Sequence, residues 1–417
     1  MLMKNDIILK KITLNKTIIS YEFETCGNIS KLLKKQELWI DYGSPINNIP
    51  ESILTIPFIS IMLPLIWVSN ATLWITKIDR TFYDATFKLR RAYSDLYPNF
   101  SLKGKIIPSY IIDNYLPIKN DGFMLFSGGL DAHTSYIRNI DIIKQLINIQ
   151  GWYKSRNEIN KVAENDFSKI SIFAKKNNLE FYGIKSNFAT LVSLKYYKKY
   201  AKKMGDSLWH GFQHSMAFIS ITIPLVYKKN GGQIIIASSF TVGDERVCAS
   251  YPTTDNEFRF AKHGKVKHDG FELSRQDKIR LIVNHQKNIK TSYPIQVCSF
   301  NNGNCCKCEK CFRTILGLIA EGANIEDFGF KIDELLLEYY QNYFKKNIAF
   351  FGVANESQTH WPYIIKRMHE NYYKLTKYHD FINWFLNYNF KKEKRKAILK
   401  YYVFNFFSII KRKIYNG

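Results

Sequence analysis

A short run of serine, glycine and aspartate is the segment of this chain best suited to bind phosphate. Its residues are Phe126, Ser127, Gly128, Gly129, Leu130 and Asp131. The two glycines permit backbone angles closed to other residues and let amide groups approach a ligand closely. Ser127 adds a hydroxyl group, and the carboxylate of Asp131 suits a Mg²⁺ ion that bridges phosphates. The other interpretation is an ordinary strand-to-helix turn. No G-x-x-x-x-G-K-[ST] sequence occurs, so the loop is not a Walker loop.

Five of the seven cysteines crowd into one short segment, which indicates a metal site. The spacing Cys305-x₂-Cys308-x₂-Cys311 places three thiolates on a tight turn, and Cys298 can complete a tetrahedron around Zn²⁺. Cys306 is left out because it lies closer to Cys308 than the usual ligand spacing allows. Four thiolates make a closed, structural site. An iron–sulfur cluster and unligated buried thiols are the alternatives.

The elements that must position these groups follow an α/β pattern. The predicted strands are Phe123–Phe126, Leu179–Ile184 and Gln233–Ala237, and helices are predicted from Asp131 to about Ile149 and over Trp209–Tyr227. Strands that alternate with helices imply a doubly wound parallel sheet, with ligands beyond the carboxyl ends of the strands. Asn187 and Ser238 follow two of these strands and are therefore candidates for contact with a nucleotide.

The length of 417 residues and an apolar fraction of 46% predict more than one domain. We expect an N-terminal α+β domain at 1–118, a nucleotide-binding α/β domain at 119–328 and a helical, basic C-terminal region at 329–417. Another predicted helix covers Asp79–Leu96. The apolar segment Ile53–Val68 is short for a membrane span and contains two prolines, so it is predicted to be a buried strand–turn–helix.

The net charge limits the classes of binding partner, and the cysteine pattern indicates the cellular compartment. Lysine and arginine number 60 and acidic residues 36, a formal net charge of +24. Such a charge favours polyanions such as nucleotides, nucleic acid, acidic lipid or an acidic protein. The basic tail Lys391–Lys413 can dock on an anionic surface or a protein partner, or it is simply a solvated helix end. An odd, clustered set of cysteines and a charged N-terminus predict a reducing, cytoplasmic location.

The loop FSGGLD resembles the PP-loop of the N-type ATP pyrophosphatases, which include asparagine synthetase, GMP synthetase and 7-cyano-7-deazaguanine synthase. These enzymes cleave ATP between the α and β phosphates, adenylate a substrate and let a nitrogen or sulfur nucleophile displace AMP. The usual pattern ends in Asp-Ser, whereas this chain has Asp131-Ala132. The resemblance implies an adenine nucleotide-binding α/β fold with ATP and Mg²⁺ as cofactors.

The cysteine segment is similar to that of the 7-cyano-7-deazaguanine synthases, with Cys306 in the place of a glycine. The similarity extends to Tyr251–Phe258 and Leu273–Ile279 and covers about half of the chain. It implies that Arg275 and Lys278 stabilise charge on the leaving pyrophosphate, although a solvated face is the ordinary role of any one cation.

Two segments that build the deazaguanine pocket in that family differ here. The arginine of the Y-P-D-x-R segment is absent, and Trp209–His214 replaces P-G-R-N. His210 and His214 stand four residues apart within this replacement, either near a substrate or as a structural pair. The chain therefore looks more like the divergent members found in accessory and anti-phage defence clusters.

These observations predict an ATP-dependent, AMP-forming ligase that adenylates a carboxylate or amide-type oxygen of a small molecule or protein. Ammonia or an amine then forms the C–N bond, since outside the cysteine cluster no thiol is placed as a sulfur carrier. The alternatives are a nucleotide- or RNA-binding accessory protein without turnover and a tRNA sulfur transferase. Asp244 and Glu245 can hold Mg²⁺ or be solvated loop acids.

Overall fold

The computed structural model describes residues 5–151, 156–243, 248–298, 303–347, 356–389 and 392–400. The chain forms two compact units. The sheet unit comprises Met1–Ser127, Ser135–Phe240 and Glu245–Phe271, and the helical unit comprises Gly128–Thr134, Thr241–Asp244 and Glu272–Gly417. The boundary thus passes through the predicted phosphate loop and through helix α3 (Leu130–Arg138).

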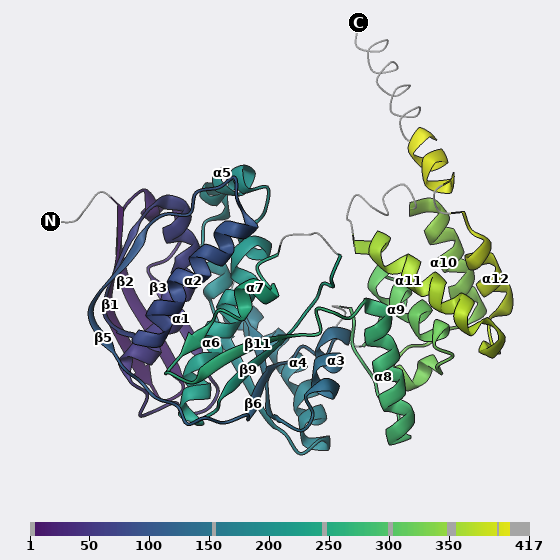
Figure 1. Ribbon diagram of the computed structural model, residues 1–417, viewed down its shortest axis with the longest axis horizontal. Helices are drawn as coiled ribbons and strands as arrows, with labels where there is room; N and C mark the ends of the chain where they lie inside the picture. Colours follow the sequence, from purple (N-terminus) through teal and green to yellow (C-terminus); the bar gives the residue numbers. More distant parts are fainter. Residues whose placement is uncertain are drawn as a thin grey trace, which may run out of the picture. The chain divides into compact units, whose positions relative to one another are not determined.

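One large, mostly parallel sheet with the strand order β10-β11-β9-β6-β7-β8-β3-β2-β1-β4-β5 forms the centre of the sheet unit. Its strands are β1 (Asn5–Asn15), β2 (Ile18–Gly27), β3 (Glu37–Asp41), β4 (Thr72–Asp79), β5 (Lys105–Ile112), β6 (Gly122–Leu125), β7 (Ile143–Gln150), β8 (Glu180–Ser186), β9 (Gln233–Ala237), β10 (Arg259–Phe260) and β11 (Gly264–Asp269). Figure 1 shows the N-terminal strands in purple at one end of this sheet and β6, β9 and β11 at the other. The α/β class predicted from the sequence is confirmed at this level.

The helices of the sheet unit include two that are buried along nearly their whole length. The helices that lie wholly within this unit are α1 (Glu51–Ser69), α2 (Arg80–Leu96), α4 (Arg156–Lys176), α5 (Leu194–Met204), α6 (His214–Lys228) and α7 (Pro252–Asp255). Short helical turns occur at η1 (Asn28–Leu32) and η2 (Phe188–Thr190), and a π-helical turn, η3 (Trp209–Gln213), precedes α6. Helices α1 and α6 pack on each other, and both are apolar on all sides, as fully buried helices are.

The N-terminal region does not form a sheet of its own. Strand β3 pairs antiparallel with β8 through Ile40↔Ser186 and Asp41↔Lys185, so the first five strands continue the sheet that contains β6, β7, β8, β9 and β11. This pairing satisfies backbone groups that would otherwise form an exposed sheet edge. The two compact units span other residues than the predicted domains 1–118, 119–328 and 329–417, whose bounds stay predictions.

The apolar segment Ile53–Val68 was predicted to be a strand–turn–helix, and this prediction was wrong. It lies within the single helix α1, which keeps Pro57 and Pro64 inside it. Within the described ranges α1 is the helix long and apolar enough to cross a membrane, but 94% of its apolar window is buried inside the protein. Such burial is typical of a core helix of a soluble protein.

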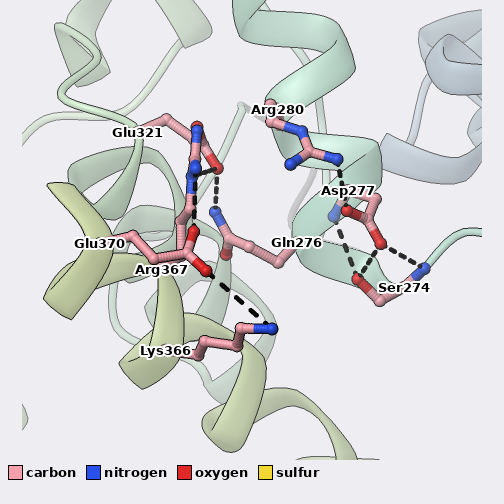
Figure 2. Close-up of polar contacts among 8 residues, drawn as sticks. All are labelled: Ser274, Gln276, Asp277, Arg280, Glu321, Lys366, Arg367 and Glu370. Carbon is pink, nitrogen blue, oxygen red and sulfur yellow. Dashed lines mark hydrogen bonds and ion pairs between the residues drawn. The ribbon is translucent and has the colours of Figure 1, made fainter.

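The helical unit contains α8 (Arg275–Ile289), α9 (Glu309–Ala320), α10 (Glu334–Asn347), α11 (Glu356–Asn371) and α12 (His379–Asn387). Two further turns are η4 (Ile325–Phe328) and η5 (Tyr372–Lys374). Figure 2 shows how the carboxylate of Glu321, which caps α9, joins α8 and α11. It accepts hydrogen bonds from Gln276 at 2.8 Å and from Arg367 at 2.8–3.0 Å. This partly buried bidentate pair fixes the three helices against one another.

Candidate functional site

The direction in which the sheet is connected reverses beside strand β6. The chain runs from β6 to β7 and β8 on one side and then returns to β9 and β11 on the other. Strands β6 and β9 pair directly and in parallel. In open α/β sheets, ligands bind beyond the carboxyl ends of the strands at such a reversal. The residues that follow Leu125 and Ala237 therefore occupy the position where this architecture places a ligand.

The glycine loop contains one residue with a left-handed backbone. Gly128 has φ of 75°, in the left-handed region that glycine adopts without strain, and a Cβ atom added there would meet nothing within 4 Å. The carbonyl oxygen of Gly128 accepts a hydrogen bond of 3.0 Å from the backbone N–H of Gln296. That of Gly129 accepts one of 3.0 Å from His133, in the first turn of α3. Ser127 is exposed.

Two other predicted loop residues are core residues through their side chains. The ring of Phe126 stacks on Phe173 at 5.1 Å between centroids, and the side chain of Leu130 is buried. The backbone N–H of Phe126 donates to the carbonyl of Ile147. Phe126 and Leu130 can therefore contribute to a ligand site only through their backbone atoms.

Asp131 lies among cations that come from two helices of the helical unit. Its Oδ1 accepts a hydrogen bond of 2.8 Å from Nζ of Lys278, whose side chain is only 4% exposed. Burial by itself would raise the pKa of Asp131, but the charges of Lys278, Arg275 and Arg313 outweigh it and hold the pKa below its usual value. Asp131 is consequently ionised at neutral pH.

Arg275 and Lys278 are held in place by the first turn of α8. Ser274 caps this helix: its hydroxyl accepts from the backbone N–H of Asp277, and the Asp277 carboxylate accepts from Ser274 in return, as Figure 2 shows. The guanidinium of Arg275 donates to Oγ1 of Thr314 at 2.9 Å. The structure thus brings the three predicted catalytic residues, Asp131, Arg275 and Lys278, into one cluster.

The side chains of Asn187 and Ser238 are engaged by the backbone of the sheet unit. The amide group of Asn187 accepts from Trp39 N at 2.9 Å and donates to the carbonyl of Glu37 at 3.1 Å, so it joins the end of β8 to β3. The hydroxyl of buried Ser238 donates to the carbonyl of Phe240 at 2.8 Å. These contacts give the Asn187 side chain a structural role in the sheet, and Ser238 lies beyond the end of β9. Contact of either residue with a nucleotide stays a prediction.

The four predicted metal ligands lie together. The sulfur atoms of Cys298, Cys305, Cys308 and Cys311 all lie within 4.8 Å of one another, and those of Cys305 and Cys311 are 3.9 Å apart. Tetrahedral Zn–S bonds of about 2.3 Å place sulfurs roughly 3.8 Å apart. The four thiols can therefore hold a metal ion such as zinc.

Backbone N–H groups further favour thiolates in this cluster. Cys305 N donates to the sulfur of Cys298, and Cys308 N to that of Cys305, both at 3.3 Å. Burial raises the pKa of Cys305, but the N–H groups of Lys307 and Cys308 lower it to about 7. Cys305 thus reaches its metal-binding form near neutral pH, whereas burial raises the pKa values of Cys308 and Cys311.

Cys306 stands outside the cluster, as the spacing predicted. It has φ of 57°, which explains why a glycine suits this position. Its sulfur accepts from Lys331 N at 3.4 Å, and its carbonyl accepts from the hydroxyl of Tyr340. The ring of Tyr340 stacks on Phe312 of α9 at 4.2 Å, so Cys306 helps join the cysteine turn to α10.

The two histidines that precede and open α6 differ in their surroundings. Nδ1 of His210 lies 2.9 Å from Oδ2 of Asp206. His214 is buried and packs on Trp209 and Phe218, and burial lowers its pKa to about 4. The pairing of His210 with Asp206 was not predicted, although the Asp-x-x-x-His spacing of these residues could have indicated it.

Sequence reasoning gave no role to Arg313, Gln296 or Tyr293. The first adds positive charge at Asp131, and the other two hold the loop: Gln296 through Gly128 and Tyr293 through a contact of 3.1 Å with Nδ1 of His133. The link between Gln296 and Gly128 left no local signal, since the two residues are far apart in the chain.

Two predictions concern residues outside the described part of the chain. Asp244 and Glu245 lie there, and so does most of the basic tail, because the description of that tail is limited to residues 392–400, which are helical.

Comparison with protein-family models and with curated proteins gives no match for this chain.

Proposed function

We propose that this protein is an ATP-dependent, AMP- and pyrophosphate-forming enzyme of the PP-loop type, which forms a C–N bond. The observation that carries the proposal is the cluster of Asp131, Lys278 and Arg275 beside a glycine loop whose backbone adopts the left-handed turn at Gly128. The position of the loop after β6, where the sheet connection reverses, supports the same reading.

The phosphates of ATP are proposed to lie against the amide groups of Gly128 and Gly129 and the N-terminus of α3, where N–H groups and the helix dipole favour an anion. Lys278 and Arg275 carry fixed positive charge on a capped helix. Charge that grows on departing pyrophosphate is stabilised best by cations that need not move during the reaction. The two residues fit this requirement.

Asp131 is proposed to hold Mg²⁺, since cations keep it ionised and its side chain remains 28% exposed. Bound Mg²⁺ would neutralise phosphate charge. The cysteine cluster is proposed to hold zinc in a structural role, because four thiolates leave no open coordination position.

The test uses the substitution Asp131→Asn, which keeps the shape of the side chain and removes its charge. We expect formation of AMP and pyrophosphate from ATP, with a small-molecule extract as the source of acceptor, to fall at least about 100-fold. Lys287→Gln, on the exposed side of the same helix α8, is the matched control and keeps full activity. Unchanged pyrophosphate release by the Asp131 variant refutes the proposal.

The alternative, an accessory protein that binds without turnover, predicts a different pattern. It predicts binding of RNA that weakens steeply with salt and no AMP with any extract. The net charge of +24 favours it. A thiolated RNA product would instead indicate sulfur transfer.

A further inference from the structure

A cavity of about 460 Å³ in the sheet unit has more cations than carboxylates in its wall and shares no residue with the glycine loop. Three segments supply the wall: the first turns of α2, the residues that follow β5, and β10 with the turn after it. The size suits a small organic molecule. Four cations face two carboxylates, which favours a ligand with net negative charge; these six residues are Arg80, Lys88, Arg259, Lys262, Asp84 and Asp113.

The buried carboxylate of Asp79 holds the three segments of this wall together. Its Oδ2 accepts hydrogen bonds of 2.9 Å from the backbone N–H groups of Phe82 and Ala261. Its Oδ1 accepts one of 2.9 Å from the side-chain amide of Asn114. One carboxylate thus joins the start of α2, the turn after β10 and the segment after β5. Because these segments are already fixed, a ligand does not have to order them when it binds.

Most of the positive charge at the cavity is available to a ligand. Arg80 pairs with Asp113 at 2.7 Å. Among the residues that the structure describes, no carboxylate forms an ion pair with Lys88, Arg259 or Lys262. Lys88 and Lys262 are exposed and Arg259 is half-buried, so an incoming anion can reach all three.

The guanidinium group of Arg259 is oriented by the backbone. Its Nη1 donates to the carbonyl of Asn256 and, at 2.8 Å, to that of Phe258. An arginine carries further N–H donors on its other two nitrogen atoms. Their planar arrangement matches the oxygens of a phosphate group, which can accept two parallel hydrogen bonds.

An exposed aromatic ring lies beside these charges. Tyr115 is 61% exposed, and Nζ of Lys262 lies 5.0 Å from the centroid of its ring. A flat base can stack on the face of the ring opposite the ammonium group. Asp84 lines the same cavity, and a carboxylate accepts hydrogen bonds from hydroxyl groups.

We infer that this cavity binds a nucleoside phosphate. The cations take the phosphate group, the carboxylate of Asp84 accepts from the hydroxyls of the sugar, and the ring of Tyr115 stacks on the base. A free mononucleotide and the 5′-terminal nucleotide of a single strand present the same three groups. The inference goes beyond the proposed function and does not depend on it, because the cavity contains no residue of the glycine loop or the cysteine cluster.

The experiment irradiates the full-length protein with 8-azidoadenosine 5′-monophosphate and locates the label by peptide mass spectrometry. We expect saturable label on the peptide that contains Tyr115 or the peptide that contains Lys262, and AMP should displace it. Tyr115→Leu should raise the half-saturating concentration about 10-fold. Label confined to the glycine loop would overturn the inference while supporting the proposed function.

A pair of charge variants tests the cations. Lys88→Gln/Arg259→Gln should raise the half-saturating concentration at least about 10-fold, because hydrogen bonds to charged groups are lost. The matched control is Lys103→Gln/Lys105→Gln, which removes the same two charges from exposed residues at the start of β5, and it should keep the natural value. Equal values for the two double variants would contradict the inference.

Competition then identifies the source of the nucleotide. Displacement of the label by 5′-phosphorylated hexaadenylate at a concentration at least about 10-fold below that of AMP assigns the site to the end of a single strand. Equal or weaker displacement assigns it to a free nucleotide. Inorganic phosphate that competes as well as AMP would show that neither base nor sugar is recognised, and would refute the inference.

Discussion

The cysteine cluster and the glycine loop are both short motifs, but they acquire their chemistry in different ways. Three of the four cysteines lie in the short segment Cys305–Cys311. The sulfurs of Cys305 and Cys311, six residues apart, are 3.9 Å from each other. The charge at the glycine loop depends instead on Lys278, which is 147 residues from Asp131. Spacing alone therefore predicts the first site, whereas the second is complete only once the chain has folded.

The cysteine cluster is expected to give the largest effect when it is broken. Cys311→Ser should lose the metal and unfold the helices that start from the cluster, because structural zinc contributes roughly 10 kcal/mol or more to folding in small zinc domains. Metal content and far-ultraviolet circular dichroism measure both effects. Cys306→Ser, outside the ligand set, should keep its metal. A fully metallated and folded Cys311→Ser protein would show that the cluster is not a metal site.

Removal of the charge of Lys278, the distant cation beside the glycine loop, is expected to have a smaller but clear effect on stability. Lys278→Gln leaves the carboxylate of Asp131 without its closest partner. Since Asp131 is 28% exposed, we expect a loss of about 2 kcal/mol in the free energy of unfolding, below the 3–5 kcal/mol of fully buried pairs. Urea denaturation measures it. Adding Asp131→Asn should recover part of the loss, and strictly additive effects would contradict direct coupling.

The pH dependence of stability tests the loop region further through His133, which lies in the first turn of α3. Burial lowers its pKa to about 3, from about 6.5 in the unfolded chain. The unfolded chain then binds the extra proton, so this histidine removes stability progressively as the pH falls from 6.5 towards 3. The midpoint temperature of thermal unfolding should therefore fall more steeply with decreasing pH for the natural sequence than for His133→Gln. Parallel curves would show that His133 takes up its proton in the folded state too.

The smallest expected effect tests whether Cys306 is a ligand or a turn residue. Cys306→Gly relieves the left-handed backbone at φ 57°, which costs a non-glycine residue about 1 kcal/mol, and it removes the weak contact with Lys331 N. We expect unchanged metal content and a gain of at most about 1 kcal/mol in urea denaturation. Loss of metal would place Cys306 among the ligands.

The sequence predicted local features well where a single run of residues determines them. Strand β9 has the predicted bounds, and α2 begins directly after Asp79, whose carboxylate caps the helix by accepting from Phe82 N. The helix predicted from Asp131 to Ile149 was wrong in its second half. It ends at Arg138, and the alternating apolar residues of β7 form a strand because β6 and β8 lie on its two sides.

Features that depend on distant partners were not predictable from the chain. Nothing near Asn187 indicated that its amide would be taken by the backbone of β3, about 150 residues away. The continuation of the sheet through β3 and β8 was hidden for the same reason. Sequence reasoning therefore located the residues of the candidate site but not the contacts that decide what each of them can do.

The hydrogen bond from the backbone N–H of Gln296 to the carbonyl of Gly128 links the glycine loop to the segment that leads into the cysteine cluster. Gln296 stands two residues before the first cysteine of the cluster, so the binding of a metal there and the ordering of the glycine loop involve the same stretch of backbone. Where one of these two events changes the free energy of the other, the effect is the same in both directions. Under the proposed function, removal of metal is expected to weaken the binding of nucleotide, and bound nucleotide is expected to slow the loss of metal.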